Sequence, residues 1–204
     1  MAKTPKIDNE ILLKAGLELM HREGKPMERL PAIGRQMRYR LSNNDTVRVR
    51  TCNDHILIVV AERPEPGARL NIEGTDWLLV VMPIMPRTPG EVIAYLVPTV
   101  EAVSEARRTH SEWLASNPNT KGENTTWNLW FDENGVGKAN GYAKKWARFR
   151  LSGAISTDDI TGGDSESVNN PVVLKDEVAA AQTRIARIAG VSPEAVKISI
   201  DFGS

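Results

Sequence analysis

The chain has 204 residues, 41% of them hydrophobic, and its 26 basic and 26 acidic side chains cancel to a formal net charge of zero. This length and apolar content suit one folded domain, or one domain with a small appendage, and they exclude a fully disordered chain. Because the total charge is balanced, electrostatic attraction to any partner has to come from local clusters of charge.

Cysteine usage and the N-terminal residues indicate the compartment. Cys52 is the only cysteine, which excludes an internal disulfide and a cysteine-based zinc site and fits a reducing environment. The N-terminus lacks the apolar core of a signal peptide, and no apolar run approaches the roughly 20 residues that cross a bilayer. We therefore expect a cytoplasmic protein that makes no membrane contact.

The first half of the chain predicts a helix followed by strands. Asp8 is a good N-cap for a helix over residues 9–23, which has a broad apolar face. The segment 46–62 predicts two consecutive strands, preceded by a turn at 43–45. The first of these strands alternates valine with arginine, so one face is apolar and the other carries Arg48 and Arg50.

Two more strands and a helix follow. Residues 77–82 form a continuous apolar run, which is typical of a strand buried on both faces, and residues 92–97 predict its partner. A second helix begins near residue 99. Its apolar positions recur at helical spacing and are Val100, Val103, His110, Trp113 and Leu114.

The remainder predicts smaller elements and a division of the chain. Residues 127–130 indicate a short strand or an anchored loop, and residues 142–151 indicate a short helix. Gly, Ser, Thr, Asp and Asn dominate 152–171, which we interpret as a flexible linker between a core domain, 1–151, and a helix–strand appendage, 172–204. The appendage helix has an apolar stripe at positions 174, 178, 181, 185 and 188. The expected fold is α+β, with a mixed β-sheet flanked by helices and a small C-terminal helix–strand unit.

Three short segments lie between the two larger helices: Val-Arg-Val-Arg-Thr at 47–51, Asp-Trp-Leu-Leu-Val-Val at 76–81 and Tyr-Leu-Val-Pro at 95–98. In this order they resemble the core of the PD-(D/E)xK nuclease superfamily, the fold of many restriction enzymes and resolvases. The resemblance spans residues 9–115, about half of the chain. It implies a restriction-endonuclease-like core.

The resemblance also implies that the usual active site is lost or relocated. Such nucleases hold Mg²⁺ with carboxylates and use a lysine, and here Arg48 takes the place of the acid and Arg50 that of the lysine. A guanidinium group does not ligate a metal and is effectively never deprotonated. We therefore expect no catalytic residue, metal or cofactor at these positions. Asp45, Glu73 and Asp76 are the candidates for a relocated carboxylate site.

Two segments are poor in acids and favour binding of DNA through its phosphates. Residues 29–50 hold six arginines against one acid, and 134–157 hold no acid. The candidate nucleic-acid-binding residues are Arg35, Arg38, Arg40, Arg48, Arg50, Lys144, Lys145, Arg148 and Arg150. In the alternative interpretation, the strand arginines are solvated or pair with Glu62, Glu65 or Glu73, and Tyr142, Trp146 and Phe149 form a buried stripe with the lysines turned to water.

Three functions remain open on the sequence. The leading hypothesis is a non-catalytic nucleic-acid-binding protein on a nuclease-like scaffold. The second is a Mg²⁺-dependent nuclease with a relocated carboxylate. The third is an assembly module, in which the stripe of the C-terminal helix pairs with a protein partner or a second copy of the chain. Cys52 also has two interpretations, a reactive thiol with a pKa lowered by Arg50 and His55, or a buried structural thiol.

Overall fold

A computed structural model of the chain describes residues 6–31, 37–65, 67–118, 125–131, 141–162, 182, 186, 191–192 and 195–198. The chain divides into two units, residues 1–161 and 162–204. In the second unit, the side-chain amide of Gln182 donates to the backbone oxygen of Val196 at 2.9 Å, and Ala186 is buried. All elements below belong to the first unit, apart from the final residue of the last helix.

Helices and strands are interspersed along the described residues, and η1 is a single 3-10 turn. In chain order, the elements are α1 Asn9–Arg22, β1 Glu28–Arg29, β2 Arg38–Arg40, β3 Thr46–Thr51, β4 Ile56–Val60, β5 Trp77–Pro83, β6 Glu91–Pro98, α2 Thr99–Ser116, β7 Thr126–Trp130, α3 Tyr142–Lys145, η1 Ala147–Phe149, β8 Ile155–Ser156 and α4 Thr157–Gly162.

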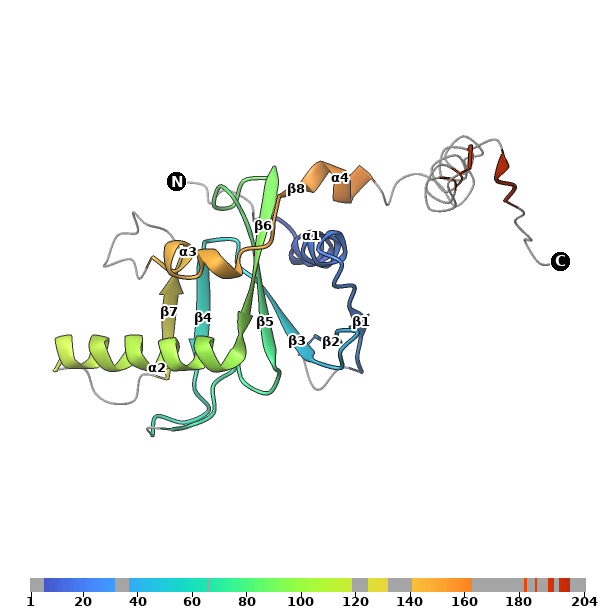
Figure 1. The fold of residues 1–204 in the computed structure, drawn as a ribbon. Coiled ribbons are helices and arrows are strands. Elements are labelled where there is room, and N and C mark those ends of the chain that lie inside the picture. The colour runs from blue at the N-terminus through green and yellow to red at the C-terminus, as the bar shows by residue number, and fades with distance from the viewer. Residues whose placement is uncertain are drawn as a thin grey trace. The chain divides into compact units, whose positions relative to one another are not determined.

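The strands form two sheets, and the larger one is mixed. Its order is β1-β2-β3-β5-β6-β8, in which β3 and β5 run parallel and every other neighbouring pair is antiparallel. The smaller sheet is the antiparallel pair β4 and β7. Figure 1 shows the larger sheet with α1 on one side and α2, α3 and the small sheet on the other. The expected α+β fold, a mixed sheet flanked by helices, is confirmed.

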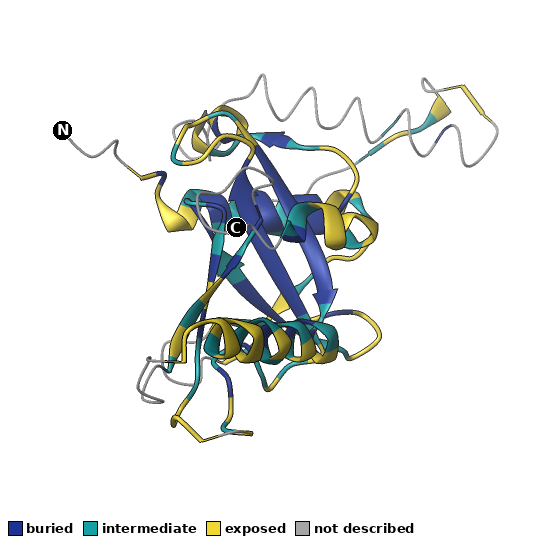
Figure 2. Ribbon diagram, turned by 90° about the vertical axis from the view of Figure 1, so that its left-hand side faces the viewer, coloured by how far each residue is buried: buried dark blue, intermediate teal, exposed yellow. Residues whose placement is uncertain are grey.

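Each face of the larger sheet has its own hydrophobic core, and the central strands are buried on both sides (Figure 2). On the first face α1 packs against β3, β5 and β6. The approach of α1 is close at Gly16, where a Cβ atom would lie 2.5 Å from Cγ2 of Val81. Any larger residue there would push α1 away from β5, since packed interiors do not absorb extra volume.

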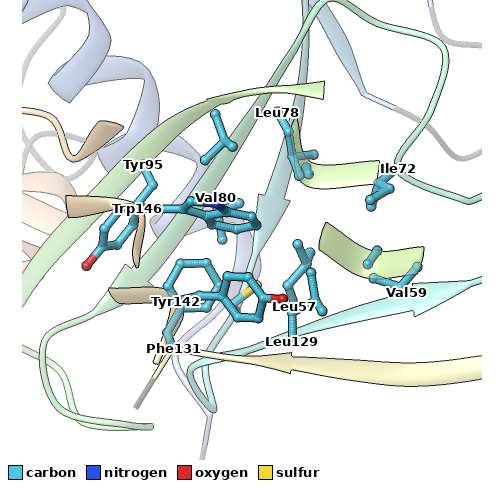
Figure 3. Close-up of a cluster of buried hydrophobic side chains, with 14 of the residues drawn as sticks. Leu57, Val59, Ile72, Leu78, Val80, Tyr95, Leu129, Phe131, Tyr142 and Trp146 are labelled. Carbon is cyan, nitrogen blue, oxygen red and sulfur yellow. The ribbon is translucent and has the colours of Figure 1, made fainter. Parts of the chain in front are cut away.

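The core on the second face is rich in aromatic side chains. Phe131, Tyr142 and Trp146 lie close together in this core (Figure 3). The ring centroids of Tyr142 and Trp146 are 4.5 Å apart, and those of Phe131 and Trp146 are 5.6 Å apart. All three side chains are at most 1% exposed, so this cluster joins α3 to the rest of the fold.

Most elements predicted from the sequence are present. The first helix, with Asp8 accepting a hydrogen bond from the backbone N–H of Glu10, is confirmed as α1, and residues 77–82 and 92–97 are confirmed within β5 and β6. The two consecutive strands of 46–62 also form, but in different sheets. The parallel pairing of β3 with β5 occupies the edge of β3 that β4 would need.

Two predictions were wrong in detail, and two short strands were missed. The apolar stripe of α2 does not face the core as a whole: Val100 is 77% and Trp113 39% exposed, while Thr99, Ala102 and Ala106 are buried, because small side chains allow α2 to lie close to β5 and β6. The helix expected over 142–151 breaks into α3 and η1 at Trp146. The short strands β1 and β2 were not predicted.

Residues 152–162, which the sequence places at the start of the linker, form β8 and α4. Ile155 of β8 pairs with Val92 and is 1% exposed, and this burial orders a segment whose composition alone indicates flexibility. The rest of the predicted linker and the apolar stripe at 174–188 lie outside the described residues. In the part of the chain that is described, no helix has the length and apolar character of a membrane span.

Candidate functional site

Five arginines gather on one side of the larger sheet. In the antiparallel pairing of β2 with β3, Arg38 lies directly opposite Arg48. Tyr39, Val47 and Val49 belong to the core beneath α1. Because side chains alternate along a strand, the arginines of β2 and β3 project from the other face. We call Arg38, Arg40, Arg48, Arg50 and Arg69, which joins them from the loop before β5, the arginine face.

Backbone carbonyl groups hold two of these arginines in place. Nη1 of Arg48 donates to the backbone oxygen of Asn71, and Nη2 of Arg50 donates to that of Ile58 at 3.2 Å. The Asn71 side chain lies against the same edge of β4, accepting from the N–H of Val60 at 3.0 Å and donating to Ile58 at 3.4 Å. Arg50 therefore connects the two sheets directly, and Arg48 does so through Asn71. Each guanidinium group has five N–H donors, so this contact leaves capacity for further acceptors.

The loop arginine meets Arg48 above Gly74. A Cβ atom at Gly74 would lie 2.7 Å from Nη2 of Arg69 and 3.9 Å from Nη2 of Arg48, so both guanidinium groups converge on the same point. Gly74 also has a φ of +95°, which favours glycine. The absence of a side chain at Gly74 therefore allows a loop arginine to come next to a strand arginine.

The arginine face concentrates positive charge at a cost in stability. Burial lowers the pKa of Arg48, and the positive charges of Arg50, Arg69 and Arg38 lower it further. The guanidinium group nevertheless stays protonated, because its ordinary pKa is far above neutral pH. Like charges directly opposite one another on a sheet are destabilising, as at the Arg38 and Arg48 pair. An anion placed over these groups would relieve the repulsion.

The five arginines of the arginine face differ in how far their side chains are exposed. Arg40 and Arg69 are exposed and Arg38 and Arg50 are half-buried, whereas Arg48 is only 3% exposed. The expectation that Arg48 lies on a solvated strand face is corrected, since the 69–74 loop covers it. Buried Arg48 adds positive charge to the arginine face, and the other four arginines are the ones that a ligand can contact. Arg35 lies outside the described residues.

The alternative interpretation named nearby glutamates as partners of the strand arginines, and within the described residues Arg38, Arg40 and Arg50 form no such ion pair. Among the residues that the structure describes, the four arginines of this face other than Arg48 form no ion pair. Glu73 instead accepts from Nη2 of Arg107 at 2.8 Å. Glu28 lies opposite Arg40 in the β1–β2 register and forms no ion pair with it.

The second predicted basic segment, residues 142–150, has a different character. Lys145 is ion-paired with Glu105, and Nη2 of Arg148 lies 2.7 Å from a carboxylate oxygen of Glu101. Both acids come from α2, so the absence of acids from the local sequence is offset by a neighbouring helix. Lys144 and Arg150 are exposed. The buried stripe of Tyr142 and Trp146 is confirmed, with Phe149 half-buried against the same core.

The second basic segment borders a cleft that none of the five residues of the arginine face lines. Arg148 and Arg150 line a cleft of about 510 Å³ whose other walls include Leu41, Trp77 and Leu96. These apolar residues belong to the core on the α1 side of the sheet, while the arginine face lies on the opposite side. The cleft and the arginine face are therefore distinct surfaces.

The carboxylates considered for a relocated metal site are engaged with local donors. Asp45 accepts from the indole N–H of Trp77 at 2.9 Å. Asp76 accepts from the N–H and the hydroxyl group of Thr46, both at 2.8 Å, and these hydrogen bonds hold the pKa of Asp76 below its ordinary value. Within the described ranges, no three or more His, Cys, Asp or Glu side chains are grouped so that they could hold a metal ion.

Cys52 is buried, and its environment decides between the two interpretations of this thiol. Burial raises the pKa of the Cys52 thiol to about 12, an effect that the positive charge of Arg50 opposes without reversing. The thiolate is the reactive form of cysteine. The structure therefore favours the structural interpretation.

Sequence reasoning missed Arg69, and it did not identify β2 as the partner of β3. The Arg38-Tyr39-Arg40 alternation repeats the polar–apolar pattern of β3 and was available as a signal for a second arginine-bearing strand. Nothing in the spacing of Arg69 marks it, because its position depends on the path of the loop. In comparisons with known proteins, no family model, curated protein or solved structure matches this chain.

Proposed function

We propose that this protein binds nucleic acid through the phosphate backbone, with the arginine face as its contact surface, and that it does so without catalysis. The observation that carries the proposal is the convergence of five arginines, from two paired strands and one loop, among which the four more accessible ones form no ion pair within the described part of the chain. Phosphate groups are the anions that guanidinium groups bind best, because two parallel N–H donors match two oxygen atoms.

The arrangement suits a polyanion better than a single small anion. Arg38 and Arg40 lie on β2, Arg50 lies on the neighbouring strand β3, and Arg69 lies on the loop next to buried Arg48, so the cations extend over two strands and a loop. Successive phosphates along a strand can be contacted by successive guanidinium groups, and each contact releases counterions. Such contacts fix position and carry no sequence information, so we expect little sequence preference.

We also propose that the first unit is a restriction-endonuclease-like core in which arginines replace the acid and the lysine of the nucleases. The helix, the mixed sheet and the position of Arg48 and Arg50 on β3 support this proposal. In this proposal, the protein has lost the metal-binding acid of the nucleases and has kept a surface that binds nucleic acid. Incubation of plasmid with Mg²⁺ or Mn²⁺ should give no cleavage, and cleavage that EDTA prevents would contradict the non-catalytic part of the proposal.

The direct test is a titration of a fluorescent duplex oligonucleotide, followed by anisotropy at about 50 mM and about 200 mM salt. Wild-type protein should bind more weakly at the higher salt. The double variant Arg40→Gln/Arg69→Gln should bind more weakly at both, and the slope of log affinity against log salt should fall by about 0.9 for each contact removed.

The matched control is Arg22→Gln/Arg108→Gln, which removes the same charge from two exposed arginines off the arginine face. Both control residues are ion-paired, Arg22 with Glu18 and Arg108 with Glu105 and Glu112. The control should retain the wild-type salt slope. Absence of wild-type binding at the lower salt would overturn the proposal, and equal losses in the two double variants would show that only net charge matters.

A further inference from the structure

A pocket lies immediately behind the arginine face, between α2 and the loop that carries Arg69. Its volume is about 260 Å³, and its walls combine apolar side chains, among them Leu70 and Leu114, with two aromatic rings and three charged residues, Arg63, Glu65 and Arg107. The rings belong to His110 of α2 and Trp127 of β7. Pockets that mix apolar walls with a few polar groups are the usual form of a ligand site.

The aromatic wall of the pocket is held in place. The His110 and Trp127 rings are stacked, with centroids 4.0 Å apart and planes within 6°. The indole N–H of Trp127 donates to the backbone oxygen of Ala106 at 3.0 Å, which fixes the indole against α2. Trp113, 39% exposed, lies nearly parallel to His110 at a centroid distance of 6.4 Å. A flat ligand would thus meet aromatic surface that is already positioned.

The segment 68–70 lies between this pocket and the arginine face. Ala68 and Leu70 line the pocket, while the side chain of Arg69 between them reaches Gly74 and Arg48 on the other side. Arg107 holds the segment, since its Nη2 donates to the backbone oxygen of Ala68 at 3.0 Å and to Glu73 at 2.8 Å. A phosphate on Arg69 and a base in the pocket can therefore belong to one stretch of strand.

We propose that this pocket receives an unpaired nucleobase of the strand whose phosphates lie on the arginine face. The inference rests on the proposed function and names its substrate class: single-stranded nucleic acid, or a duplex end with a free base. Bases within a duplex are stacked on both faces and paired at one edge, so entering the pocket would cost unstacking energy. Aromatic side chains next to a cationic track are the usual means of holding a single strand without sequence preference.

The first test requires no variant. Anisotropy titrations of wild-type protein compare a labelled oligothymidine of about 12 nucleotides with a fully abasic oligomer of the same length and with a duplex. All three carry a phosphate backbone, and only the first offers free bases. We expect the oligothymidine to bind about tenfold more tightly than the abasic strand, a loss that corresponds to stacking of about one base.

The second test blocks the pocket. Ser111 is an exposed residue of α2 that lines the pocket, and Ser111→Trp should weaken oligothymidine binding about tenfold and leave duplex binding unchanged. Ser104→Trp, at an exposed position of the same helix outside the pocket, is the control and should bind like wild type. Thermal unfolding of both variants shows whether the fold is retained.

The outcomes separate the two proposals. If wild-type protein binds the abasic strand and the duplex as tightly as oligothymidine, and Ser111→Trp changes nothing, the pocket inference is overturned and phosphate binding by the arginine face stands. If wild-type protein binds none of the three at low salt, the proposed function fails, and the pocket inference fails with it. Selective loss of oligothymidine binding in Ser111→Trp supports both.

Discussion

The arginine face and the segment 142–150 contain basic side chains at similar density, yet the fold treats them differently. On the arginine face, cations from β2, β3 and one loop converge, and Arg38 lies directly opposite Arg48. In the segment 142–150, α2 supplies Glu101 and Glu105 as ion-pair partners. In the first region, Arg38, Arg40, Arg50 and Arg69 form no ion pair within the described part of the chain, while in the second two of the four cations are paired.

The two regions also differ in how they are anchored. Arg48 and Arg50 donate to the backbone oxygens of Asn71 and Ile58, so charged groups themselves connect the two sheets. The segment 142–150 is attached through Tyr142 and Trp146, which are fully buried in the aromatic core (Figure 3). A basic cluster is better evidence for a ligand surface when its own fold leaves the charges without acid partners.

The largest effect is expected from removal of the aromatic anchor. Trp146→Ala should lower the free energy of unfolding by about 3–5 kcal/mol, because a fully buried indole is replaced by a cavity. Urea unfolding measures the loss. Trp146→Phe is the matched control: it keeps a ring in the core and removes an indole N–H that has no hydrogen-bond partner among the described residues, so it should cost much less. Equal losses in the two variants would contradict this account of the anchor.

A smaller effect is expected when the acids of α2 are neutralised. Glu101→Gln/Glu105→Gln removes the ion-pair partners of Arg148 and Lys145 and leaves every basic residue in place. If pairing is what makes this segment a poor phosphate surface, the variant should bind duplex DNA about threefold more tightly at low salt, as expected for one additional weak phosphate contact. Anisotropy titration measures the change.

The control for this variant is Glu18→Gln/Glu112→Gln, which likewise removes two acids, one paired with Arg22 on α1 and one with Arg108 on α2. It corrects for the change in net charge alone. An unchanged affinity in Glu101→Gln/Glu105→Gln would mean that the segment 142–150 is unsuited to phosphate for reasons of shape, and the comparison would then rest on geometry instead of on pairing.

The smallest effect is a pH dependence of the same ion pairs. Burial raises the pKa of Glu105, but hydrogen bonds from Arg108 and Lys145 outweigh burial and hold the pKa below its ordinary value of 4.5. A lowered pKa in the folded state means that Glu105 contributes stability above about pH 4.5 and loses it as the pH falls through the folded-state pKa.

The difference in melting temperature between wild-type protein and Glu105→Gln should therefore narrow as the pH is lowered from about 6 to about 3. Glu65→Gln changes an exposed glutamate that forms no ion pair among the described residues, and it should show no such trend. A gap for Glu105→Gln that widens at acid pH would show that the ion pairs with Lys145 and Arg108 do not stabilise the fold.

Much of the local structure was predictable because it depends on short-range patterns. The Asp8 cap, the valine–arginine alternation of β3 and the apolar runs of β5 and β6 each identify their element from neighbouring residues. The helix α2 was placed correctly and its buried face was not, since close packing on β5 and β6 selected small residues over Val100. A hydrophobic pattern along the sequence does not show which side of a helix can pack most closely against a sheet.

The sequence by itself determined that arginines occupy one face of β3 and that no acid accompanies the cations between residues 134 and 157, because both are properties of consecutive residues. Only the tertiary structure decided how these cations are placed relative to one another and to acids. Strand register brought Arg38 to Arg48, the loop path brought Arg69 to Gly74, and α2 brought Glu101 and Glu105 to Arg148 and Lys145. The electrostatic energy of two charges depends on their distance in space. The sequence alone therefore did not decide whether the cations of each region would lie next to other cations or next to acids.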